Sequence, residues 1–106
     1  MPKFMIEATY SVEGAMGLSK EGGVKRREAA KAAVKSVGGK MECFYFAFGG
    51  ADALVIFDAS DNASAMAASV AINASGLVQA QTMVLLTAEE MDAAVKKNVK
   101  YRAPGQ

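Results

Sequence analysis

Residues 40–58 read KMECFYFAFGGADALVIFD, and this stretch decides the fold. It contains two runs of strand-forming residues, 40–48 and 52–57, with Gly49-Gly50 between them. Because a double glycine allows a tight reversal of the chain, the short connection predicts an antiparallel hairpin. Both runs are nearly all apolar or aromatic, which is typical of strands that are buried on both faces.

Periodicity and capping residues predict the elements on either side of this hairpin. Ser11 is suited to cap a short helix, Ser60 or Asp61 a longer one, and Thr87 with Glu90 forms the pattern of a capping box. Gly38-Gly39 and Gly76 are expected to end helices, because glycine adopts the left-handed cap conformation at little cost. The further strands are expected at residues 3–10 and 78–86, and the helices at residues 12–18, 24–37, 62–74 and 88–99.

The expected order of the main elements is β-α-β-β-α-β, followed by a short helix. This order predicts an α+β, ferredoxin-like fold, in which a four-stranded antiparallel sheet carries both main helices on one face. Residues 1–100 are expected to form a single domain, and residues 101–106 a C-terminal tail without periodicity.

Three of the strands are apolar on both faces, so the second face of the sheet also needs a cover. In residues 40–48, simple alternation gives one face Phe44, Phe46 and Phe48 and the other Met41, Cys43 and Tyr45. A chain of 106 residues is too short to cover both faces, which predicts a homodimer whose sheets pack face to face as a dimeric α/β barrel. The alternative is that the C-terminal helix covers that face within one chain.

Composition and charge exclude several classes of protein. Twelve basic and eleven acidic residues give a net charge of +1, so we expect no nucleic-acid partner. No apolar run approaches the ~20 residues of a membrane span, and Glu7 interrupts the N-terminal apolar residues; we therefore expect no membrane association and a cytoplasmic location.

The chain has no histidine and one cysteine, Cys43, which excludes a His-based triad, a Cys/His zinc site and an intrachain disulfide. No metal or cofactor is expected, and Cys43, among apolar neighbours, is expected to be unreactive.

The candidate ligand-binding residues are polar side chains on otherwise apolar strands: Glu7, Tyr45, Asp52, Gln79 and Gln81. Glu7, Gln79 and Gln81 share a strand face with apolar neighbours, and Tyr45 is a further member of this set. A few polar groups in an apolar cavity are typical of a small-molecule pocket, but the same groups are equally suited to hydrogen-bond across a dimer interface. Asp52 follows the double glycine, where a carboxylate either binds a ligand at the barrel mouth or accepts hydrogen bonds within the turn; the turn role is favoured.

The segment FGGADA at residues 48–53, followed by LVIFD, resembles the signature of the GYD domain family. The opening residues MPKF and the stretch VLLT at residues 84–87, with Glu90-Met91, are also similar to that family. The tyrosine that gives the motif its name is replaced by Ala51, so any role of that side chain is missing here. The resemblance implies the dimeric α/β-barrel fold, in a family of uncharacterised function.

Two functions of different kinds are therefore expected. The first is a homodimeric module, on its own or within a larger oligomer, that binds a small apolar ligand or serves in assembly. The alternative is a cofactor-independent, monooxygenase-like enzyme that acts on a small aromatic substrate in the barrel cavity. The absence of histidine favours the first. Tyr101 and Arg102 in the tail are placed to close over a cavity or to clasp a partner.

Overall fold

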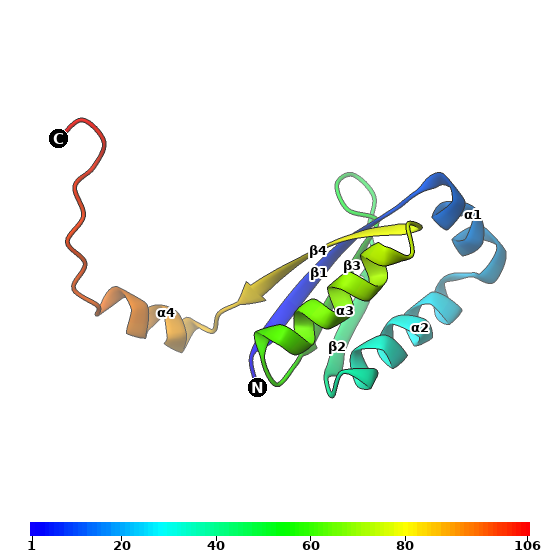
Figure 1. Ribbon diagram of the computed structural model, residues 1–106, viewed down its shortest axis with the longest axis horizontal. Helices are drawn as coiled ribbons and strands as arrows, with labels where there is room; N and C mark the ends of the chain where they lie inside the picture. Colours follow the sequence, from blue (N-terminus) through cyan, green and yellow to red (C-terminus); the bar gives the residue numbers. More distant parts are fainter.

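The computed structural model describes residues 1–106 and has the expected α+β architecture (Figure 1). The elements are β1 (Lys3–Tyr10), α1 (Val12–Glu21), α2 (Gly23–Ser36), β2 (Lys40–Phe46), β3 (Ala53–Asp58), α3 (Asn62–Ala74), β4 (Val78–Leu85) and α4 (Ala88–Val95). The strands form one antiparallel sheet in the order β2-β3-β1-β4, which is the ferredoxin-like arrangement predicted from the element order.

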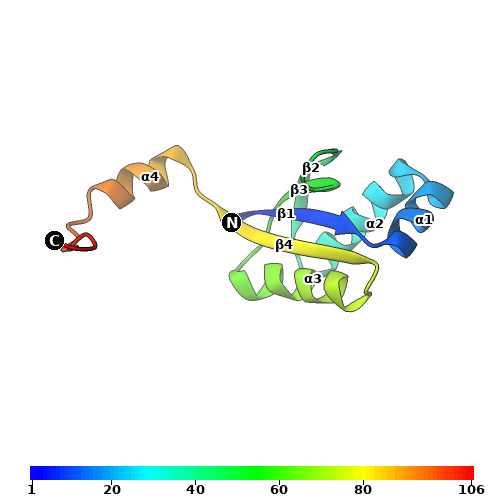
Figure 2. The same ribbon diagram turned by 90° about the horizontal axis from the view of Figure 1, so that it is seen from above.

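The molecule has two layers, a sheet and a pair of helices. Helices α2 and α3 cover one face of the sheet, and α1 lies beyond the end of β1 (Figures 1 and 2). No helix covers the other face, which we call the open face. The ferredoxin-like fold therefore leaves a complete sheet surface without a cover from its own chain.

The core lies between the sheet and the two helices and is built from a few large side chains and many alanines. Phe4 and Phe57 are almost completely buried and stack with their ring centroids 5.6 Å apart. The other buried apolar residues are Ile6, Ala8, Val34, Ala53, Val55, Ala59, Ala65, Ala68 and Ala80. Because alanine occupies little space, the helices lie close to the sheet, and the core between them is thin.

A β-bulge in β2 changes which side chains face the helices. The pairing with β3 shifts between Met41 and Cys43, so that Met41 lies opposite Phe57 and packs against the core. Simple alternation placed Met41 on the same face as Cys43 and Tyr45, and this assignment is wrong. The inserted residue of a bulge breaks the period of two, so every face assignment before it is reversed.

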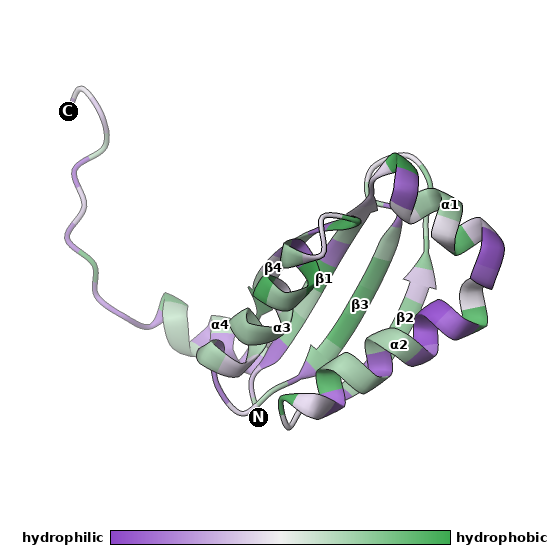
Figure 3. Ribbon diagram, turned by 45° about the vertical axis from the view of Figure 1, so that its right-hand side comes forward, coloured by the Kyte–Doolittle hydropathy of each residue, from purple (hydrophilic) through white to green (hydrophobic).

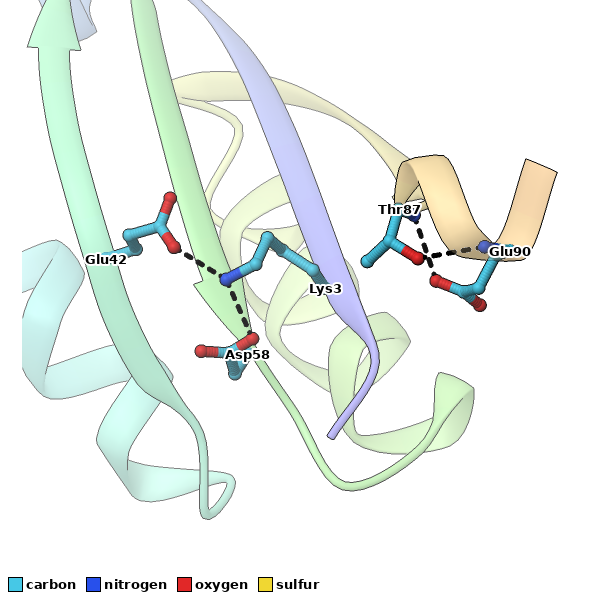
Figure 4. Close-up of polar contacts among 5 residues, drawn as sticks. All are labelled: Lys3, Glu42, Asp58, Thr87 and Glu90. Carbon is cyan, nitrogen blue, oxygen red and sulfur yellow. Dashed lines mark hydrogen bonds and ion pairs between the residues drawn. The ribbon is translucent and has the colours of Figure 1, made fainter. Parts of the chain in front are cut away.

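The predicted caps are present, and some element boundaries differ from the prediction. Ser11 accepts a hydrogen bond from the Gly14 amide and Asp61 one from the Ser64 amide. The Thr87–Glu90 capping box also forms (Figure 4). Strand β2 ends at Phe46 instead of residue 48, since the chain has already entered the loop to β3.

The C-terminal helix α4 ends at Val95, four residues earlier than expected, and it stands away from the sheet and its helices (Figures 1 and 2). None of its residues is buried. The alternative in which the C-terminal helix covers the second face of the sheet within one chain is therefore wrong. None of the four helices combines the length and the apolarity that a membrane crossing requires.

Candidate functional site

The open face of the sheet is graded from charged to apolar to polar along the strands. Its apolar centre is a row that crosses all four strands and consists of Cys43, Ile56, Met5 and Met83. The next row consists of Tyr45, Leu54, Glu7 and Gln81, and Thr9 paired with Gln79 follows. An apolar band thus lies beside a polar end that is confined to β1 and β4.

A charged cluster occupies the other end of the open face. The Lys3 ammonium group donates hydrogen bonds to Glu42 on β2, at 2.6 Å, and to Asp58 on β3, at 3.0 Å (Figure 4). The hydrogen bond to Glu42, followed by that to Asp58, raises the pKa of Lys3 above its ordinary value. Since ion pairs of this exposure contribute little stability, the cluster serves chiefly to tie β1, β2 and β3 in register.

The polar end of the open face forms a recess of about 230 Å³. It is lined by Glu7, Thr9, Gly50, Ala51, Gln79 and Gln81. The sheet register brings Glu7 opposite Gln81 and Thr9 opposite Gln79, so the carboxylate and the two amides come from adjacent strands. Glu7, Gln79 and Gln81, selected from the sequence, therefore lie together, whereas Thr9, Gly50 and Ala51 were not selected.

The wall formed by Gly50 and Ala51 belongs to the β2–β3 loop, which carries the family motif. At position 51 the motif has a tyrosine, and the alanine found here adds only a methyl group to the wall. A short alternating pattern predicts a strand but not which loop lies beside that strand in the folded protein. Only the three-dimensional arrangement therefore reveals this wall.

Tyr45 and Asp52 do not line this recess. Tyr45 lies on the open face of β2, with Leu54 of β3 between it and Glu7, and its side chain is 67% exposed. Asp52 accepts a hydrogen bond from the Tyr10 amide at 2.9 Å, and its own amide donates to the Ala8 carbonyl at 2.8 Å. These contacts fasten the end of the hairpin to β1, so the Asp52 carboxylate holds an amide of a neighbouring strand and not one within its own turn.

A second cavity, which the sequence did not indicate, lies on the helix side of the sheet. It is an apolar slot of about 90 Å³ between α2 and α3, over β3, the strand that is visible between the two helices in Figure 3. Its walls include Ala29, Ala30 and Ala33 of α2 and Ala68 and Ile72 of α3. The slot exists because alanines on the facing sides of two splayed helices do not fill the space between them.

Tyr10 and Arg26 are the polar members of the slot lining. Burial raises the pKa of the Tyr10 hydroxyl, while the neighbouring Arg26 guanidinium acts in the opposite direction. Arg26 also forms a long ion pair with Glu21, at 3.3 Å. The slot is thus lined by apolar groups over most of its length, and the Arg26 guanidinium lies at one end.

No three His, Cys, Asp or Glu side chains gather closely enough to hold a metal ion. Cys43 is a free thiol, partly buried in the apolar row of the open face.

The comparisons with known proteins agree with the fold and with the motif around the recess. The GYD domain matches residues 4–95, from the first strand to the end of α4. No curated protein and no solved structure matches the chain. Since the match spans nearly all of the described fold, the chain belongs to the GYD domain family.

Proposed function

We propose that this protein is a homodimeric binding module, in which the open faces of two sheets pack against each other and the polar recess receives a small ligand. The observation that carries the proposal is the open face itself. It presents an apolar row across four strands with no cover from its own chain. Removing a sheet face of this composition from water is favourable and contributes about 25 cal/mol of stability per Å² of apolar surface.

A second copy of the same sheet is well suited as the cover. Two sheets pack about 10 Å apart, with side chains from both inner faces between them. The apolar rows then form a shared core, and the recess beside Glu7 lies at the rim of that core. This places one carboxylate, one hydroxyl and two amides beside the apolar row. Small-molecule sites combine a few such polar groups with a larger apolar lining, which here would come from the shared core.

Sedimentation tests the dimer. We expect the chain at micromolar concentration to have a mass of at least twice 11.0 kDa. Ile56→Lys places a charge in the middle of the apolar row and lowers that mass. Met16→Lys is the matched control, because Met16 is exposed on α1, away from the open face, and its variant keeps the native mass. A native chain that sediments as a single copy overturns the proposal.

Two variants of the recess test ligand binding, with hydroquinone as a small aromatic probe. We expect the probe to shift the NMR signals of the Thr9, Gln79 and Gln81 amides. Ala51→Tyr restores the motif residue in the wall of the recess and, by occupying space, reduces the shifts; Glu7→Gln reduces them by removing the charged acceptor. If the probe shifts no recess signal, or if Ala51→Tyr leaves the shifts unchanged, the recess is not the binding site.

The enzymatic alternative places the reaction in the same recess. Glu7 is the one titratable side chain in its lining, so it would have to act as the base. Anaerobic and aerobic incubation with hydroquinone distinguishes the two functions. A binding module leaves the probe unchanged, whereas a monooxygenase-like enzyme consumes it together with oxygen, and Glu7→Gln abolishes that consumption.

A further inference from the structure

Helix α4 presents an apolar stripe that nothing in its own chain covers. Met91 and Val95, one turn apart, are 52% and 70% exposed. The capping box fixes the first turn of this helix, so it is an ordered element. The radius of gyration of the molecule is 16.7 Å, whereas a compact domain of this length has about 13 Å. The chain from Leu86 to Gln106, which we call the arm, therefore extends well beyond the domain.

The helix layer offers a surface that complements α4 in shape. The slot between α2 and α3 has a volume of about 90 Å³ and is walled mainly by alanines. A methionine side chain is unbranched and flexible and adapts well to an irregular apolar gap of this size. Met66 and Val70, on the outer side of α3, are also more than half exposed, but they lie about half a turn of helix away from the slot residues Ala68 and Ile72.

The same layer complements α4 in charge. Helix α2 has five basic residues and one acidic, a net charge of +4, whereas α3 has no charged residue. Helix α4 has three acidic residues and no basic one, a net charge of −3. In Figure 3 most of the strongly hydrophilic segments of this layer accordingly lie on α2.

The charges of α4 are unevenly distributed around its stripe. At 100° per residue, Asp92 and then Glu89 follow Met91 and Val95 on one side, whereas Ala94 and then Glu90 follow on the other, and the Glu90 carboxylate is held in the capping box with Thr87. When the stripe lies over the slot with Asp92 and Glu89 toward α2, the side with Ala94 and the single carboxylate of Glu90 faces uncharged α3. Asp92 then lies near the α2 cations, of which Lys25 is one turn before the slot residue Ala29.

We infer that the arm is an exchange element: α4 of one copy docks into the slot between α2 and α3 of a second copy, with Met91 as the inserted side chain. This contact uses the helix layer, on the opposite side of the sheet from the open face. It is therefore independent of the face-to-face dimer proposed above and, when both form, links dimers into larger assemblies.

Cysteine cross-linking between two different chains tests this contact. Both chains carry Cys43→Ser; one also carries Met91→Cys and the other Ala29→Cys, in the wall of the slot. Under mild oxidation we expect disulfide-linked heterodimers to form about tenfold faster than in the control mixture, where Met16→Cys on exposed α1 replaces Ala29→Cys. Equal rates in the two mixtures overturn the inference. The inference is also overturned if a chain that carries both Met91→Cys and Ala29→Cys forms only the disulfide within one chain.

A charge reversal tests the orientation with Asp92 and Lys25, which are exposed and do not contribute to the core. Asp92→Lys in the Met91→Cys chain slows the cross-link severalfold, and Lys25→Glu in the Ala29→Cys chain restores it. Lys20→Glu on α1 is the matched control and restores nothing. Failure of Lys25→Glu to restore the rate overturns the docking geometry. Ile56→Lys leaves the cross-link intact if the inference holds, so the two contacts are tested separately.

Discussion

Gly14 is the position where the structure makes the sharpest prediction about stability. It lies in α1, and a Cβ atom at this position would be 2.0 Å from the Leu77 carbonyl oxygen and 3.0 Å from its carbon. The same carbonyl accepts hydrogen bonds from the Ser11 amide, at 2.9 Å, and from the Ser11 hydroxyl, at 3.1 Å. Glycine thus allows the start of α1 to lie directly against the loop between α3 and β4.

The effect of Gly14→Ala follows from three contributions. Alanine in a helix is favoured over glycine by about 1 kcal/mol. Against this, the displaced Leu77 carbonyl loses or weakens two hydrogen bonds of about 1 kcal/mol each. Forcing backbone apart adds about 1–3 kcal/mol of overpacking cost. The net expectation is a destabilisation of about 3 kcal/mol, or a melting temperature lower by about 12 °C.

Gly17→Ala is the matched control, since Gly17 lies one turn later in the same helix with no atom within 4 Å of its Cβ position. We expect it to stabilise the protein by about 0.5–1 kcal/mol through helix propensity alone. Urea unfolding of both variants measures the two free energies. The close approach of α1 to Leu77 is refuted if Gly14→Ala is as stable as Gly17→Ala.

Two further predictions concern acidic residues that hold backbone amides. Asp52→Ala leaves the Tyr10 amide without its acceptor and should lower the free energy of unfolding by about 1–3 kcal/mol; Asp52→Asn, which retains an acceptor, should lose less in urea unfolding, and equal losses would contradict the hydrogen-bonding role. The hydrogen bond from the Ser64 amide lowers the pKa of Asp61, so its contribution to stability is full above the ordinary aspartate pKa and is lost as the pH falls through the lowered value. Asp61→Asn should therefore flatten the acid side of the stability profile, and an unchanged profile would contradict this account.

Local signals in the sequence were sufficient to predict most of the fold. The Ser11, Asp61 and Thr87 caps located three helices and the strand patterns located the strands, whereas helical periodicity and Gly38-Gly39 located α2. All of these signals act over a few residues. The bulge between Met41 and Cys43 was not predicted, since its extra residue, Glu42, also fits simple alternation with the neighbouring apolar residues. The position of α4 also had no local signal, because its capping box specifies where the helix begins and not what it packs against.

The candidate site was predicted in part for the same reasons. Glu7, Gln79 and Gln81 were selected because they share a strand face, and antiparallel pairing of β1 and β4 brings them together. The wall contributed by Gly50 and Ala51 depends on the path of a loop. The slot between α2 and α3 depends on the angle between two helices. Neither the path nor the angle is encoded in a short pattern, and tertiary packing determines both.

The central claim is that the open face is buried between two copies, and Cys43 measures this directly. The thiol lies in the apolar row opposite Ile56, and the chain has no other cysteine. We predict that its rate of alkylation by a maleimide falls as the protein concentration rises through the micromolar range, and that Ile56→Lys removes this protection. An alkylation rate that is independent of concentration, and equal in the native chain and the Ile56→Lys variant, would contradict the account.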